Sequence, residues 1–154
     1  RTSEADLQGA VDQMLVLNRA ASEVFVGAGV VAATDVTGFG LLGHGLEMAR
    51  ASGTRFTYDT RSLPPLPGAL ELAAAGVETG GAAHNRRFVA DSLDVAPDVA
   101  PERVTLAFDP QTSGGLLAAV SSHRLAEVES ALTSANVPHW RVGRVEEGTG
   151  VRLW

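Results

Sequence analysis

The sequence predicts one α+β domain over residues 1–154, with helices covering a mixed or antiparallel sheet. Three observations lead to this fold class. Segments with helical periodicity are mixed irregularly with short apolar segments typical of strands. Two apolar runs near the C-terminus flank a glycine-containing turn, as in an antiparallel pair. The chain has 154 residues, which is the length of one ordinary domain.

Helical periodicity predicts four helices. Leu7, Val11 and Met14 recur near the helical period, and Ser3 offers a side-chain oxygen that can begin their helix. Gly76 is a suitable residue to end a later helix. The predicted helices span residues 3–26, 38–51, 70–75 and 122–134.

Short apolar runs predict the strands, and the last two form a hairpin around residues 146–150 that contains Trp140 and Trp154. These tryptophans are expected to fill the core or an inter-domain face. Residues 62–68 form a loop, and residues 80–101 are the least regular stretch. The predicted strands span residues 30–35, 54–58, 104–108, 116–120, 140–145 and 151–154.

Composition excludes several classes of function. The net charge of -6 argues against nucleic-acid binding, which needs a clustered basic face. The chain has no cysteine and no lysine, so it supplies neither a thiolate nucleophile nor a Schiff-base or phosphate-loop lysine. No apolar run is long enough to span a membrane, and the first residues do not form a signal peptide, so a cytoplasmic location is expected. Because the chain begins at Arg1, we expect a fragment of a larger protein, with terminal processing as the alternative.

The first stretch that could carry chemistry is residues 34–44, which read TDVTGFGLLGH. Asp35 ends a predicted strand, and glycines then open a predicted helix. A carboxylate in that position can bind Mg²⁺, while N–H groups at the start of the helix can bind phosphate. The alternative is structural: Asp35 caps the helix and the glycines permit tight packing. The spacing alone favours the structural alternative, because it matches neither a Walker A loop nor a dinucleotide-binding motif.

The second stretch is residues 109–117, which read DPQTSGGLL. Asp109 could bind a cation, and Thr112 or Ser113 an anion. The alternative is a structural turn in which Asp109 and Thr112 bond local backbone groups. The four histidines are too dispersed for a convincing metal cluster, and His44 is expected to pack or bond within the domain.

Together, these two stretches, Gly80-Gly81 with Asn85, and the NRAA run at 18–21 resemble the C-terminal half of selenophosphate synthetase (selenide, water dikinase). The resemblance covers residues 8 to 120. It implies the two-domain fold of the group of ATP-using enzymes that includes aminoimidazole ribonucleotide synthetase. The resemblance also implies an N-terminal domain that supplies a reactive cysteine or selenocysteine, a lysine and further aspartates, and a homodimeric full-length protein. The reaction implied is that of ATP, selenide and water to selenophosphate, AMP and phosphate.

Carried over by position, the resemblance makes Asp35 a magnesium ligand, and gives Thr37, Gly38 and Gly40 a supporting role at the Mg-ATP site. Residues 109–115 match the second motif, whose contribution cannot be separated from structural support. The segment 43–46 departs from the pattern, with glycine where a larger apolar residue is expected, which concerns helix packing. No catalytic residue is expected in this chain, and the implied partners are the N-terminal domain, ATP and selenide. The alternatives are a related enzyme resembling aminoimidazole ribonucleotide synthetase and a non-catalytic dimerisation domain.

Overall fold

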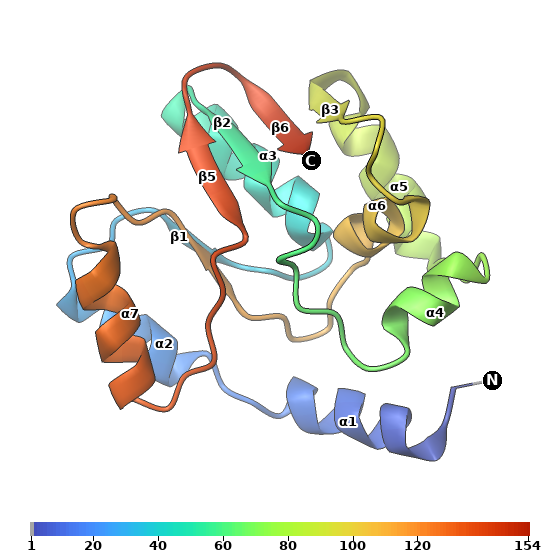
Figure 1. The fold of residues 1–154 in the computed structure, drawn as a ribbon, viewed down its shortest axis with the longest axis horizontal. Helices are drawn as coiled ribbons and strands as arrows, with labels where there is room; N and C mark the ends of the chain where they lie inside the picture. The colour runs from blue at the N-terminus through green and yellow to red at the C-terminus, as the bar shows by residue number, and fades with distance from the viewer. Residues whose placement is uncertain (1) are drawn as a thin grey trace.

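A computed structural model describes residues 2–154 as a four-stranded sheet, a separate two-stranded sheet and seven α-helices (Figure 1). In chain order the elements are α1 (Glu4–Met14), α2 (Arg19–Gly27), β1 (Ala33–Asp35), α3 (Gly40–Ser52), β2 (Arg55–Tyr58), α4 (Ala69–Ala74), α5 (Gly80–Val89), the 3₁₀ helix η1 (Ala90–Ser92), β3 (Leu93–Val95), α6 (Pro101–Phe108), β4 (Leu116–Ala118), α7 (Leu125–Ser134), β5 (Gly143–Glu146) and β6 (Gly150–Leu153). This arrangement confirms the predicted α+β class.

The four-stranded sheet has the order β3-β6-β2-β5, and β2 is therefore an inner strand. It pairs antiparallel with β5 and parallel with β6. The predicted terminal hairpin is wrong, because β2 lies between its two strands. The connection between them turns at Gly148 and Gly150, which both have positive φ, and Gly150 lies against the Ser92 carbonyl. Trp140 and Trp154 are 58% and 44% exposed, so they do not fill the core, and their place at an inter-domain face stays a prediction.

The second sheet consists of β1 and β4, paired antiparallel with Asp35 opposite Leu116. Both strands are three residues long and thus shorter than predicted. Their pairing brings the segment that follows β1 beside the segment that precedes β4. The two motifs, about eighty residues apart in the chain, therefore meet at one end of this sheet.

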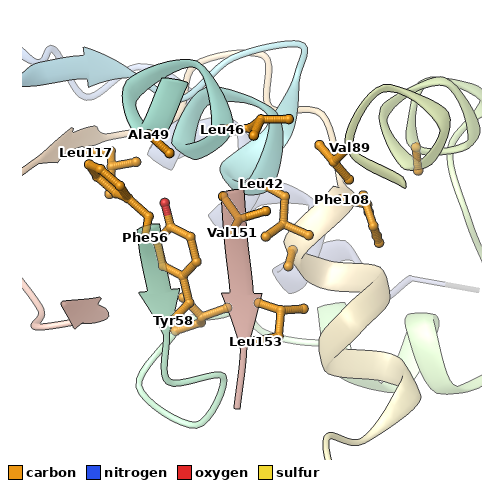
Figure 2. Close-up of a cluster of buried hydrophobic side chains, with 13 residues drawn as sticks. Leu42, Leu46, Ala49, Phe56, Tyr58, Val89, Phe108, Leu117, Val151 and Leu153 are labelled. Atoms are coloured by element: carbon orange, nitrogen blue, oxygen red, sulfur yellow. The ribbon is translucent and has the colours of Figure 1, made fainter. Parts of the chain in front are cut away.

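The main core lies between α3 and the inner face of the four-stranded sheet (Figure 2). Leu42 and Leu46 of α3 meet Phe56 of β2 and Val151 and Leu153 of β6, all of them buried. A smaller core joins α2 to α7 around Val128 and Leu132, and Figure 1 shows these two helices side by side, away from the four-stranded sheet. None of the helices in residues 2–154 is long and apolar enough to cross a membrane.

The predicted helix over residues 3–26 is two helices, α1 and α2, separated at residues 15–18. The Ser3 side chain accepts a hydrogen bond from the Asp6 N–H (3.0 Å), which confirms the predicted start of α1. Asn18 explains the break, because its Nδ2 donates to the Gly114 carbonyl oxygen (3.1 Å) and fixes the chain against the second motif. No residue of α1 is buried.

Two further predictions are wrong. Residues 80–101 contain the regular helix α5 and the strand β3, and residues 104–108 are helical rather than extended. The apolar, β-branched run around Val104 suggested a strand, but Pro101 occupies the first turn of α6, where it favours a helix. The C-terminal end of that helix is fixed by packing, since Ala107 and Phe108 are buried against α3 and α5.

The packing of Tyr58 explains Gly45, one of the two unexpected glycines in residues 43–46. A Cβ at this position would lie 2.0 Å from the Oη of Tyr58. Figure 2 shows Tyr58 pointing from β2 toward α3 with its hydroxyl foremost. That hydroxyl is buried and lacks a hydrogen-bond partner within the described chain, and burial raises the pKa of Tyr58. The glycine therefore makes room for the tyrosine.

We expect Gly45→Ala to lower the free energy of unfolding by about 1–3 kcal/mol, because the new methyl group overpacks the α3–β2 contact. Tyr58→Phe alone should be neutral or stabilising, because it removes a buried hydroxyl that lacks a partner. In the Tyr58→Phe background the cost of Gly45→Ala should shrink. Urea unfolding of the four proteins measures this coupling.

Gly27→Ala is the matched control, because a Cβ at this helical glycine has nothing within 4 Å. This substitution should be neutral or slightly stabilising. Strictly additive effects of Gly45→Ala and Tyr58→Phe would contradict the proposed steric conflict.

Candidate functional site

The loops that follow β1 and precede β4 cross each other and bond backbone to backbone. The Val36 N–H donates to the Gly115 carbonyl (2.9 Å), and the Gly114 N–H donates to the Val36 carbonyl (3.1 Å). The Gln111 N–H donates to the Thr37 carbonyl (3.0 Å). The structure thus joins the two motifs into one unit.

Glycines allow this close crossing at two points. A Cβ on Gly114 would lie 2.2 Å from the Val36 carbonyl oxygen. Gly40 has φ +65°, and a Cβ there would lie 2.9 Å from the carbonyl oxygen of Phe108. Both contacts are with backbone atoms, which cannot move aside as a flexible side chain can. The two glycines are therefore required by packing.

Asn85 bonds to both motifs from α5. Its Nδ2 donates to the Gly38 carbonyl (2.9 Å) and to the Phe108 carbonyl (3.0 Å), and the residue is 1% exposed. Gly38 lies just before α3, and Phe108 is the last residue of α6. One buried amide therefore sets the position of α3 relative to α6 and the second motif.

Asp35 is exposed at the end of β1. Within residues 2–154 its carboxylate has no hydrogen bond or ion pair, and the nearby Thr34 hydroxyl donates to the Asp35 main-chain oxygen instead (3.3 Å). The structural alternative, in which Asp35 caps α3, is not what the structure shows, because Phe39 occupies the N-cap and no side chain caps this helix. The loop thus presents a free carboxylate and an uncapped helix N-terminus.

A magnesium ion fits this arrangement if Asp35 is one of several ligands. Mg²⁺ is commonly held by one or two carboxylates, with water and substrate phosphates completing its shell. No group of three or more acidic or histidine side chains that could hold a metal gathers anywhere in residues 2–154. Within the described residues, Asp35 therefore does not form a complete metal site by itself.

The three predicted supporting residues occupy different environments. A Cβ on Gly38 would meet nothing within 4 Å, so Gly38 faces open space. Gly40 is buried and packs against the second motif. The Thr37 carbonyl accepts from the Gly40 and Gln111 N–H groups, and its hydroxyl lies 3.0 Å from the Nε2 of His44. Gly38 and Thr37 can face a ligand, whereas Gly40 shapes the loop.

Asp109, the first residue of the second motif, is half-buried. Its carboxylate accepts from the Thr79 hydroxyl (3.2 Å) and from the Gln111 side chain (3.1 Å). Desolvation raises the pKa of Asp109, although both hydrogen bonds oppose that shift. The structural alternative placed Asp109 on local backbone groups, but its carboxylate bonds two side chains instead, one of them on the segment before α5. Thr112, in the same loop, is exposed.

Sequence reasoning missed two polar residues around the site, Thr79 and Glu47. Glu47 Oε2 lies 3.2 Å from the Nδ1 of His44, which is buried and bonds within the domain as predicted. Their spacing of three residues on one helix was the available signal. Thr79 gave no comparable signal, because its contact with Asp109 depends on how α5 and the second motif pack.

Comparison with known proteins identifies the family. A family model described as "AIR synthase related protein, C-terminal domain" matches residues 3–154. The chain belongs to this family. Curated relatives agree with the resemblance drawn from the motifs. The selenide, water dikinase of Nitratidesulfovibrio vulgaris (strain DP4) is 46% identical over 137 residues, which cover 88% of this chain and 39% of that protein.

A second selenide, water dikinase, from Caldanaerobacter subterraneus subsp. tengcongensis, is 42% identical over 139 residues, covering 90% of this chain and 40% of its own. The chain spans about two-fifths of the length of these relatives. Two solved structures share the fold of this AIR synthase related domain. Thiamine-monophosphate kinase from Stenotrophomonas maltophilia K279a has a TM-score of 0.50 and 21% identity, and covers 80% of this chain and 31% of its own. The tt0281 protein from Thermus thermophilus has a TM-score of 0.55 and 18% identity, with coverage of 84% and 33%.

We expect Asn85→Ala to lower the free energy of unfolding by about 2–4 kcal/mol, because it leaves two buried carbonyl oxygens without their shared donor. Chemical unfolding of the chain measures this loss. His84→Ala is the matched control, since His84 is the exposed neighbour of Asn85 on α5. Equal stability of both variants would contradict the role assigned to Asn85.

Asp109→Asn should stabilise the chain at neutral pH, because it removes the cost of ionising a half-buried carboxyl group. The raised pKa of Asp109 means that the folded state holds its proton at a pH where the unfolded state has released it. Its contribution to stability therefore declines as pH rises from the ordinary aspartate pKa through the higher folded value. The stability difference between variant and parent should grow over this window and then level off. Thermal unfolding from about pH 3 to about pH 7 tests this, and a difference that shrinks with rising pH would contradict it.

Proposed function

We propose that residues 1–154 are the C-terminal domain of a selenide, water dikinase, which converts ATP, selenide and water to selenophosphate, AMP and phosphate. One observation carries the proposal: the two motifs that resemble selenophosphate synthetase form a single bonded unit with a free carboxylate at its surface. Relatives that bear the name selenide, water dikinase match nearly nine-tenths of the chain. The proposal extends their activity to the protein that contains this chain.

Asp35 contributes one oxygen ligand to Mg²⁺ at the polyphosphate of ATP. When bound, the ion offsets the negative charge of the phosphate oxygens during transfer. The exposure of Asp35 and its lack of a partner within the described chain support this role. Gly38 and Thr37 border the same loop, where exposed backbone can approach phosphate without obstruction by a Cβ.

An N-terminal domain of the same protein completes the site. The chain lacks the lysine and cysteine that the resemblance assigns to that domain. α1 and the segment that follows it also expose a row of apolar side chains, which favours a covering partner. These exposed residues are Leu7, Val11, Met14, Leu15, Val16 and Leu17. We assign this surface to the N-terminal domain, within a full-length protein that acts as a cytoplasmic homodimer.

In the full-length protein, Asp35→Ala should reduce magnesium-dependent formation of AMP from ATP and selenide by about a hundredfold, because it removes a metal ligand. The thermal midpoint should stay within about 1 °C of the parent's, since the Asp35 side chain is exposed and bonds to nothing in the described chain. AMP and selenophosphate are quantified over a magnesium titration.

Asp98→Ala is the matched control, because Asp98 is also an exposed carboxylate and lies in a loop outside both motifs. The isolated 154-residue chain should form no AMP, because the nucleophile and lysine are absent from it. Turnover by the isolated chain would overturn the division of labour between domains. A full-length protein that binds ATP without consuming it in the presence of selenide would overturn the proposed reaction, and would favour another ATP-using reaction or a purely dimerising role.

A further inference from the structure

Three side chains form a continuous chain of hydrogen bonds beside the first motif. Glu47 Oε2 lies 3.2 Å from His44 Nδ1, and His44 Nε2 lies 3.0 Å from Thr37 Oγ1. The Glu47 side chain is 52% exposed and His44 is buried. The chain therefore runs from solvent, through the imidazole, to the loop that carries Asp35.

The carboxylate sets the direction of the hydrogen bonds. An ionised Glu47 can only accept, so the proton of a neutral His44 ring is on Nδ1. Nε2 then has a lone pair and no proton, and it accepts from the Thr37 hydroxyl. In this tautomer the Thr37 hydroxyl directs its proton at His44. The oxygen keeps its second lone pair, so toward a ligand it can accept a hydrogen bond or approach a cation but cannot donate.

Packing holds this arrangement in place. The Phe39 ring meets the imidazole edge-on at 5.7 Å between centroids, and it stacks on Phe88 at 5.3 Å. The Thr37 main chain is anchored because its carbonyl accepts from Gly40 and from Gln111. These contacts restrict the ring and the loop, as a preorganised polar group requires.

We propose that Glu47 and His44 are positioning residues that make the Thr37 hydroxyl an acceptor for the hydrated cation at Asp35, rather than a donor to a phosphate oxygen. This inference rests on the proposed function, because it specifies which part of the Mg-ATP site, the hydrated cation or the phosphate, the Thr37 hydroxyl contacts. It gives Thr37 an outer role in which its oxygen accepts from cation-bound water. Such supporting contacts to metal sites commonly change metal affinity by about 10- to 100-fold.

The first test is spectroscopic and requires no metal. In the ¹⁵N-histidine-labelled 154-residue chain there are four ring systems, and the His44 signal is the one lost in His44→Gln. We expect the ring proton on Nδ1, which faces the Glu47 carboxylate, and none on Nε2, which faces the Thr37 hydroxyl. A ring protonated at Nε2, or at both nitrogens, would overturn the proposal, because the imidazole would then donate to Thr37.

The second test uses two substitutions of His44 in the full-length protein. The amide of His44→Gln reaches the position of Nε2 and can still meet Thr37, whereas the shorter His44→Asn reaches the position of Nδ1 and can meet only Glu47. We expect His44→Asn to raise the magnesium concentration for half-maximal activity at least about tenfold. His44→Gln should show only a small part of this increase. Neither substitution should raise the KM for selenide in parallel.

His84→Asn, on the exposed face of α5, is the control and should leave the magnesium requirement unchanged. Equal magnesium requirements for His44→Asn and the parent, at matched thermal midpoints, would overturn the positioning role. A loss shared equally by His44→Asn and His44→Gln would overturn it as well, since both variants would then only weaken packing. Failure of the proposed function gives a different result. In that case the unsubstituted full-length protein shows no selenide-dependent turnover, and the protonation of the His44 ring measured by NMR is unaffected.

Discussion

The two hydrogen bonds donated by Asn85 are the interaction on which the rest of this domain depends. They reach the carbonyls of Gly38 and Phe108 from a position sealed away from solvent. Gly38 leads into α3, which covers the sheet, and Phe108 ends α6, which packs on α3, α4 and α5. Satisfied buried amides tolerate few alternative geometries. The direction in which the Asp35 loop leaves β1 is therefore tied, through one side chain, to the packing of the main helices.

Local signals predicted the elements whose boundaries depend on local chemistry. The Ser3 cap, Gly76 after α4 and the periodicity of α3 and α7 all correspond to observed features. Elements decided by distant contacts were mispredicted. The apolar run at 104–108 suits a strand by propensity but is helical, because tertiary packing overrides a weak local preference. The separation of β5 from β6 could not be inferred from the turn between them, since the strand that lies between them in the sheet is nearly ninety residues away in sequence.

The site was predictable to the extent that its residues lie in continuous motifs. The placement of Asp35 at the end of a strand and the glycines before α3 followed from the order of residue types, and the structure adds the reason for Gly40 and Gly114. What sequence could not supply is the encounter between motifs: the backbone bonds of Thr37 with Gln111, and of Val36 with Gly114. The contact of His44 with Thr37 could not be predicted either, because it depends on the loop before α3 folding back on the helix.

The inner position of β2 has a consequence for the order in which the chain can fold. β2 ends at Tyr58, yet both of its neighbours in the sheet are drawn from residues 143–153. Helices α3 to α6 can form their mutual contacts earlier, but the sheet they cover cannot close until almost the entire chain is present. Loop-closure entropy makes such distant pairings slow. During synthesis, the apolar surface of α3 that later covers β6 therefore stays uncovered until β6 has been made. In this interval the nascent domain is most prone to aggregation.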